Sequence, residues 1–228
     1  MHPTASVSLV AAFCVVVLAV VAAVVAAVVV VSAAWRTRAL VAAAVWLAAT
    51  AGIGVSGALL QFDARPPPFV IVLLLTVGVA VVVSVSDVGA ALSRLPLWWL
   101  VAFQAFRLPL ELVMHAAANE GVMPRVMSFE GRNFDIAAGA CAIVVAVALR
   151  RGASPTWALA WLVGASATLL NVVVVAVLAS PMVRFFGDGE LNVWVAYAPF
   201  VWLPTVLVAS ALAGHIVLGR ALWTLQRR

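Results

Sequence analysis

The stretch that decides the fold reads Gln104-Ala-Phe-Arg107-Leu-Pro-Leu-Glu111-Leu-Val-Met-His115-Ala-Ala-Ala-Asn119, and it lies inside an otherwise apolar segment. On a helix with about 100° per residue, its polar side chains at 104, 107, 111 and 115 fall within roughly 80° of one another. Charged side chains at membrane depth are rare and usually face the interior of a helical bundle. The spacing therefore predicts one inward-facing polar stripe, which is the first candidate for a functional site.

The rest of the chain has the composition of an integral membrane protein. Of its 228 residues, 67% are hydrophobic and 9% are charged, and the mean hydropathy is +1.22. Soluble domains carry about 25% charged residues. All basic residues are arginine, so chemistry that needs a lysine Schiff base is excluded. The arginines stand at the ends of apolar runs and do not cluster, so the lipid bilayer is the expected partner and nucleic acid is not.

Apolar runs predict an all-α bundle of seven transmembrane helices that forms a single domain over residues 1–228. A spanning helix needs about 20 apolar residues, and only the fifth run is clearly shorter. The first run exceeds the roughly 7–15 apolar residues of a signal peptide, so we expect it to be a span. The runs cover residues 7–34, 39–60, 69–85, 97–118, 136–149, 157–178 and 193–218.

Arginine placement predicts the orientation of this bundle. With the N-terminus outside, eight arginines fall in the inner loops and at the C-terminus, four fall in the outer loops, and Arg107 lies within the membrane. Loops rich in Lys and Arg stay in the cytoplasm. Removing the fifth run would move Arg150 and Arg151 to the side that holds the acidic loops. We therefore predict seven spans with a cytoplasmic C-terminus, in a bacterial inner membrane.

The outer loop after the fourth run, residues 119–135, is long and mixes charged with apolar side chains. Loops beyond about 12–15 residues are usually functional or disordered. Because the fifth run is short, we expect Asn133 and Asp135 to dip toward Glu111 and His115. The loop is a candidate lid, and the alternative is a solvated connection without further role.

These features together predict an outward-facing polar pocket, between the fourth and seventh helices, that binds a small ligand or ion. In this hypothesis Arg107 holds an anionic group or neutralises Glu111, and His115 is a switch that responds to protons. The alternative for the Arg107–Glu111 pair is an ion pair that only joins helices. Pro109 is expected to kink the fourth helix. The predicted ligand-binding residues are Gln104, Arg107, Glu111, His115, Asn119, Glu130, Arg132, Asn133, Asp135, Asn171, Asn192 and Tyr197.

Two other functions remain open. One is a metal-assisted intramembrane hydrolase that uses Glu111, His115 and Asp135, although zinc sites are usually richer in nitrogen and sulfur ligands. The other is a structural membrane subunit. No cofactor is predicted: His215 is expected near the inner interface, too far in depth from His115 to share a haem iron. His2 is expected to belong to the N-terminal tail and not to be a ligand.

The segment Phe129-Glu-Gly-Arg-Asn-Phe-Asp-Ile136, preceded by Phe106-Arg-Leu-Pro-Leu-Glu111, resembles segments of bacterial multi-pass membrane proteins to which no activity is attached. The resemblance covers about a third of the chain, the fourth and fifth runs with the loop between them. It implies a multi-pass membrane fold and no specific function.

Overall fold

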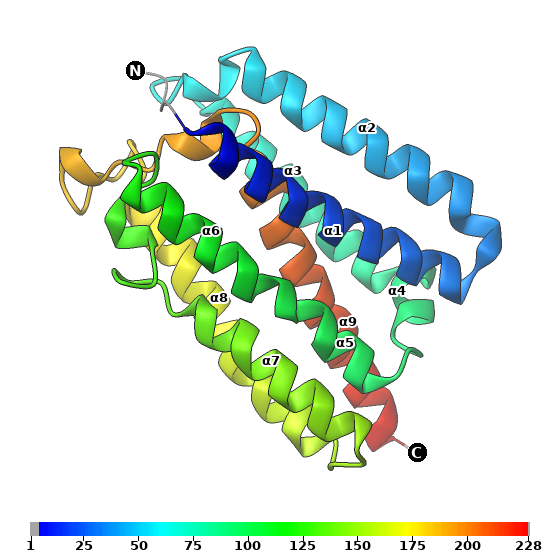
Figure 1. Cartoon of the computed structure of the whole chain (residues 1–228). Helices are drawn as coiled ribbons and strands as arrows, with labels where there is room; N and C mark the ends of the chain where they lie inside the picture. The colour runs from blue at the N-terminus through cyan, green and yellow to red at the C-terminus, as the bar shows by residue number, and fades with distance from the viewer. Residues whose placement is uncertain (1–4, 228) are drawn as a thin grey trace.

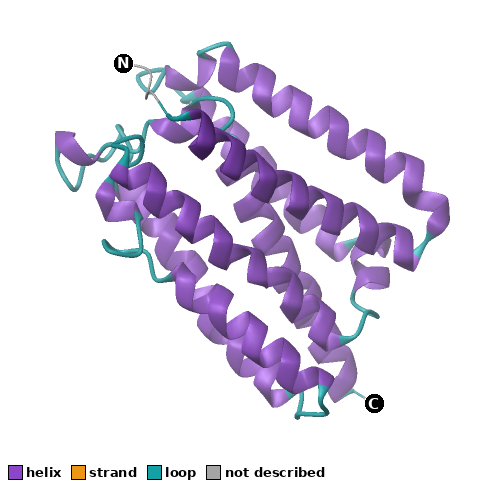
Figure 2. Ribbon diagram, viewed as in Figure 1, coloured by secondary structure: helices purple, strands orange, loops and turns teal. Residues whose placement is uncertain are grey.

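The computed structural model describes residues 5–227, and within this range the chain forms helices and connecting segments without a strand (Figures 1 and 2). His2 and Arg228 lie outside the described residues. The α-helices are α1 (Val7–Val31), α2 (Arg36–Val55), α3 (Pro68–Val85), α4 (Asp87–Leu92), α5 (Leu97–Phe103), α6 (Arg107–Asn119), α7 (Asp135–Arg150), α8 (Thr156–Leu178) and α9 (Ala209–Gln226).

Six helical segments of the described chain are long and apolar enough to cross a membrane, as expected for a multi-pass membrane protein. They are Val7–Val31, Ala33–Val55, Pro68–Val85, Leu97–Asn119, Thr156–Leu178 and Leu203–Gln226. The fifth predicted run is also a helix, α7, but its 16 residues make it shorter than these six. The prediction of a helical membrane bundle is confirmed at this level.

Local sequence explains where several helices begin. Ser6 precedes α1, and its hydroxyl accepts a hydrogen bond from the backbone N–H of Leu9 at 3.2 Å. Pro68 occupies the first position of α3, where its missing N–H costs nothing. Ser86 caps the short inner helix α4 by accepting from the backbone N–H of Val88.

The fourth span is interrupted next to its proline. α5 and α6 are separated by one 3₁₀ turn, Gln104–Phe106. The ring of Pro109 conflicts with the carbonyl four residues earlier, that of Ala105, so the regular α-helical pattern is disturbed there. The interruption lies at the position where the polar stripe begins, and both Gln104 and Arg107 remain buried.

The last helix begins later than the sequence predicted. The run 193–218 was expected to be one helix, but its first part contains the 3₁₀ turn Trp194–Ala196 and Pro199, and the long helix spans Leu203–Gln226. Hydropathy alone does not separate a buried apolar connection from a helix. Because the last helix also continues to Gln226, beyond the predicted end at residue 218, His215 lies at its middle and not near its inner end.

Buried polar residues lie between two apolar cores. One core contains Leu110 and Met114 of α6 with side chains of α1 and the 193–207 segment. The other contains Leu100 and Val101 of α5 with side chains of α7, α8 and α9. Gln104 falls between these two stretches in the chain and is fully buried. The polar stripe thus forms a layer across the middle of the bundle.

Two glycines allow helices to approach closely at this layer. A Cβ atom on Gly139 of α7 would collide with the backbone of Arg107 and Leu108. A Cβ atom on Gly214 of α9 would collide with the side-chain amide of Gln104. Small residues permit this kind of close backbone approach in membrane bundles. Their positions bring α7 and α9 against the interrupted fourth span.

Candidate functional site

Arg107 and Asp135 form a buried ion pair between α6 and α7. Their side chains are 1% and 7% exposed, and the pair is bidentate: Arg107 Nε donates to Asp135 Oδ2 at 2.6 Å while Nη2 donates to Oδ1. Asp135 is the first residue of α7, where the helix dipole favours a negative charge. The predicted pairing of Arg107 with Glu111 is therefore wrong, because the close approach of α7 at Gly139 offers Arg107 a better placed carboxylate.

The same guanidinium also contacts α8 and α9. Nη2 lies 3.1 Å from Thr168 Oγ1 and 3.3 Å from the carbonyl oxygen of Ala165, and Nη1 lies 3.3 Å from Nε2 of His215. An arginine only donates, so Nε2 of His215 accepts and the imidazole carries its proton on Nδ1. The Nδ1–H group points to Ser166 Oγ, and the distance between Nδ1 and Oγ is 3.2 Å. Arg107 thus joins α6 to three other helices, α7, α8 and α9, through one charged group.

The expectation that His215 lies at the inner interface is wrong. Its side chain is buried, packs edge-on against Trp161 with ring centroids 5.6 Å apart, and uses both ring nitrogens within the network. The reason is that the last helix both begins later, at Leu203, and ends later, at Gln226, than the predicted run 193–218. A signal for the later start was present in the sequence, since Pro199 and Pro204 disfavour a helix that begins at residue 193.

Glu111, one turn beyond Arg107, is held by the loop and not by an arginine. Asn133 Nδ2 lies 2.9 Å from both Glu111 carboxylate oxygens and 3.1 Å from the carbonyl oxygen of Met127. Asn133 Oδ1 accepts from the backbone N–H of Asp135 at 2.9 Å. The end of the loop therefore dips into the bundle, and Asn133 connects Glu111 to the start of α7.

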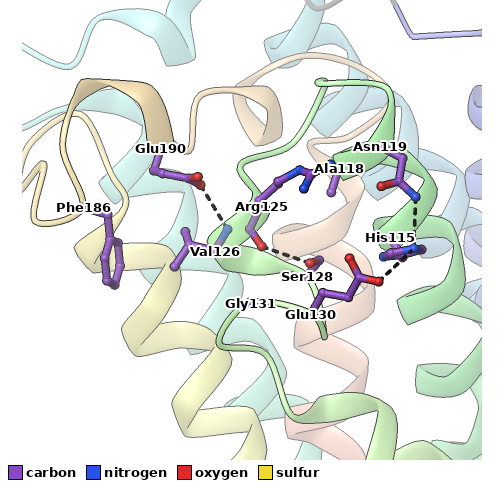
Figure 3. Close-up of a pocket in the computed structure, with 10 residues that line it drawn as sticks. All are labelled: His115, Ala118, Asn119, Arg125, Val126, Ser128, Glu130, Gly131, Phe186 and Glu190. Atoms are coloured by element: carbon purple, nitrogen blue, oxygen red, sulfur yellow. Dashed lines mark hydrogen bonds and ion pairs between the residues drawn. The ribbon is translucent and has the colours of Figure 1, made fainter.

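A pocket lies at the end of the bundle that holds the 119–135 loop (Figure 3), and it is called the outer pocket below. Its volume is about 370 Å³, and α6, the 119–135 loop and the 179–193 connection all contribute to its wall. Polar and charged side chains from the three segments face it. The lining residues are His115, Ala118, Asn119, Arg125, Val126, Ser128, Glu130, Gly131, Phe186 and Glu190.

His115 forms one side of this pocket. Its Nε2 accepts from Asn119 Nδ2 at 3.0 Å and lies 3.8 Å from a carboxylate oxygen of Glu130, and its ring stacks on Phe129 with centroids 4.5 Å apart. The other ring nitrogen, Nδ1, is buried and has no hydrogen-bond partner among residues 5–227. Because Nε2 accepts, Nδ1 carries the proton and is an unused donor.

The outer lid, residues 119–135, is packed against its neighbours. The backbone N–H of Val126 donates to Glu190 at 3.0 Å, and Asn171 Nδ2 donates to the carbonyl oxygen of Arg132 at 2.6 Å. The Arg132 guanidinium lies over the ring of Phe186, 5.3 Å from its centroid. Residues 119–135 are thus bonded to α8 and to the 179–193 connection.

Nine of the twelve predicted site residues fall into three groups, and Gln104, Asn192 and Tyr197 lie outside them. His115, Asn119 and Glu130 line the pocket, and Arg107, Glu111, Asn133 and Asp135 form the buried network. Arg132 and Asn171 fix the lid, while Gln104 Nε2 donates to the carbonyl oxygen of Ala211 at 3.1 Å. Asn192 bonds the end of α8 through the carbonyl of Ala176, and neither Asn192 nor Tyr197 is among the lining residues.

Sequence reasoning missed residues in both parts of the site. Arg125 and Glu190 of the pocket carried no signal beyond their charge in an outer loop. Ser166 and Thr168 lie in an apolar run, where small polar residues also serve simple helix packing. Their link to Arg107 and His215 appears only when the helices are assembled.

The donors required for the metal-assisted alternative do not assemble. Within residues 5–227, no group of three or more His, Cys, Asp or Glu side chains gathers closely enough to hold a metal ion. Asp135 is paired with Arg107, and His115 faces the lid. The proposed set of Glu111, His115 and Asp135 is therefore not a metal site in this structure.

In comparisons with known proteins, no family model, curated protein or solved structure matches this chain.

Proposed function

We propose that this chain is a seven-helix protein of the bacterial inner membrane, with its N-terminus outside, that binds a small polar ligand or ion in the outer pocket. The start of α1 and the end of α9 lie at opposite ends of the bundle (Figure 1), which favours an odd number of crossings. α7 supplies the seventh, with a length of about 24 Å for its 16 residues. The excess of arginine at the end that holds the C-terminus supports this orientation.

The composition of the pocket wall carries the ligand proposal. Its volume of about 370 Å³ suits a small molecule. Arg125 offers a positive charge, and Glu130 and Glu190 offer negative charges. Such a lining favours a ligand that carries both donor and acceptor groups, above all a small zwitterion or an organic cation.

The buried network has a supporting part in this proposal. The Arg107 guanidinium is engaged by Asp135, Thr168 and His215, so it is not the group that receives an anionic ligand. Glu111 lies one turn below His115 on the same helix and is bonded to the lid through Asn133. The network thus fixes α6 and the lid, which between them build most of the pocket wall.

The test uses the full chain in lipid nanodiscs. Thermal unfolding is followed in the presence of amino acids, organic amines, carboxylates and inorganic ions, and calorimetry then measures the affinity of any stabilising probe. Arg125→Gln and Glu130→Gln should weaken binding by about tenfold or more, which corresponds to about 1.4 kcal/mol. Arg184→Gln is the matched control, because this exposed arginine pairs with Asp188 and does not line the pocket.

Equal binding by Arg125→Gln, Glu130→Gln and the Arg184→Gln control would reject the outer pocket as the ligand site. If no probe stabilises the wild type, and the pocket variants change stability alone, the chain is a structural membrane subunit.

A further inference from the structure

The buried charges of the network do not balance at Glu111. Arg107 and Asp135 neutralise each other, but within the described residues no arginine or histidine nitrogen lies within 4.0 Å of the Glu111 carboxylate. Glu111 is 1% exposed, and the side-chain amide of Asn133 is its hydrogen-bond donor. An ionised carboxylate in such a place is poorly compensated, whereas a neutral carboxylic acid is tolerated far better.

We propose that Glu111 is a proton-binding site within the membrane segment, and that its proton occupancy controls how firmly the outer lid is attached. The proton comes from water in the outer pocket and forms an O–H bond on one carboxylate oxygen; on release it returns to that water. The proton site stands independently of any ligand, whereas its consequence for ligand access rests on the function proposed above.

A proton fits the donor set around Glu111 better than a metal cation does. The atom that Asn133 turns toward Glu111 is its Nδ2 donor, while its Oδ1 is already used by the backbone N–H of Asp135. A cation would need several oxygen ligands. Within the described residues, no such cluster of acidic or histidine ligands exists.

Other ionisable groups near Glu111 are accounted for. From α7, Asp135 is held as a carboxylate by the bidentate guanidinium of Arg107. From α9, His215 accepts from Arg107 and is therefore neutral. On α6 itself, His115 lies one turn above Glu111, and its 25% exposed side chain makes it the competing proton site. α1 carries Cys14 and no charged residue over Val7–Val31. Within the lid, Arg125 and Glu130 are exposed, and the Arg132 guanidinium lies over the ring of Phe186.

The link to the lid follows from hydrogen-bond polarity. In the ionised form both Glu111 oxygens accept from Asn133 Nδ2, each at 2.9 Å. Protonation turns one oxygen into an O–H donor that faces another donor, so one of the two contacts is lost and the other loses its charge. Asn133 belongs to the lid, and its amide also fixes the carbonyl of Met127. A protonated Glu111 therefore holds the lid less firmly.

Infrared spectroscopy of the full chain in nanodiscs tests the proton site. Exposed carboxyl groups are ionised at neutral pH, so a carboxylic-acid C=O band under these conditions marks a protonated buried group. We expect such a band in the wild type, its loss in Glu111→Gln, and its retention in Glu120→Gln, which alters an exposed carboxylate. A wild-type spectrum without the band, or a band that persists in Glu111→Gln, overturns the proposal.

Hydrogen–deuterium exchange tests the link to the lid at one fixed alkaline pH, at which the carboxylic-acid band of the wild type has disappeared and Glu111 is ionised. Glu111→Gln is neutral like the protonated acid, so exchange in residues 120–134 should rise by about tenfold. Glu111→Asp keeps a carboxylate, so its exchange should rise less than that of Glu111→Gln. An equal rise in both variants would mean that damage to the fold, and not loss of the charge, causes it, which overturns the proposal. Asp63→Asn, which alters an exposed carboxylate outside the lid, should leave exchange at the wild-type value. Equal exchange in Glu111→Gln and Asp63→Asn overturns the proposal. Neither readout requires a bound ligand, so failure here is distinct from failure of the ligand proposal.

Discussion

Replacing Asp135 with asparagine should be among the most damaging conservative changes in this chain. The substitution keeps the size of the side chain but removes the charge that balances Arg107, which is 1% exposed. The two N–H groups that Arg107 turns toward Asp135 would face a neutral amide. Removing one partner of a buried ion pair costs about 3–5 kcal/mol. For a chain of this length, that corresponds to a fall of about 6–20 °C in the unfolding temperature.

The exposed pair Arg184–Asp188 is the internal reference for this measurement. It has the same residue types, but its side chains are 59% and 77% exposed and lie four residues apart in one segment. Asp188→Asn should therefore change the free energy of unfolding by about 0.5 kcal/mol or less. Both variants are compared by thermal and denaturant unfolding in the same micelles.

A double variant separates loss of charge balance from loss of contacts. Arg107→Met combined with Asp135→Leu removes both charges, so no uncompensated ion remains in the bundle. It should be less destabilised than Asp135→Asn alone, although it changes more atoms. If Asp135→Asn costs no more than Asp188→Asn, or if the double variant is the less stable, the buried ion pair is not what holds α6 to α7.

Two further predictions concern packing and pH. Gly139→Ala should destabilise the fold by about 1–3 kcal/mol, because the added Cβ would collide with the backbone of Leu108. Gly164→Ala should be neutral or stabilise the fold by up to about 1 kcal/mol, because the added Cβ would meet no atom within 4 Å. The free energies of unfolding of both variants test this, and equal effects would contradict the close approach of α7. The hydroxyl and the backbone N–H of Ser6 donate to Glu120 and hold the pKa of that carboxyl below its usual range. At pH values above the pKa that Glu120 has in the unfolded chain, this contact therefore stabilises the start of α1. The stabilisation is lost as the pH falls through the lower pKa of the folded protein. Amide exchange at residues 6–10, corrected for the intrinsic rate, should rise in acid and should already be raised at neutral pH in Glu120→Gln; exchange that is the same in both proteins would refute the contact.

Helical spacing predicted the direction of the polar stripe well. Gln104, Arg107 and Glu111 are each at most 1% exposed, so the face that the spacing defines does point inward. It did so although a 3₁₀ turn replaces regular helix at Gln104–Phe106. The reason is physical: polar groups in lipid are costly enough that the bundle arranges itself to bury them.

The partner of Arg107 could not be read from spacing within one helix. An i,i+4 pair with Glu111 is locally possible, and the sequence alone sees only such local possibilities. The choice of Asp135 depends on how closely α7 approaches, which Gly139 permits. His215 was misplaced for a related reason, since an apolar run that includes a non-helical connection has the same hydropathy as one that is helical throughout.

Directional polar contacts explain why this bundle adopts one arrangement of its helices. Lipid chains are as apolar as leucine, so apolar burial alone does not select which helix faces which. In the 97–226 part, Arg107 joins α6 to α7, α8 and α9, and Gln104 fixes α9. On the other side, α2 is joined to the last helical segment by two indole donors, Trp46 to the carbonyl of Thr205 at 2.9 Å and Trp202 to that of Leu47 at 3.2 Å. Because His215 and the carbonyl groups of Ala211 and Thr205 all belong to the last helical segment, a change in the position of that segment would disturb its contacts with Arg107, Gln104 and Trp46 together.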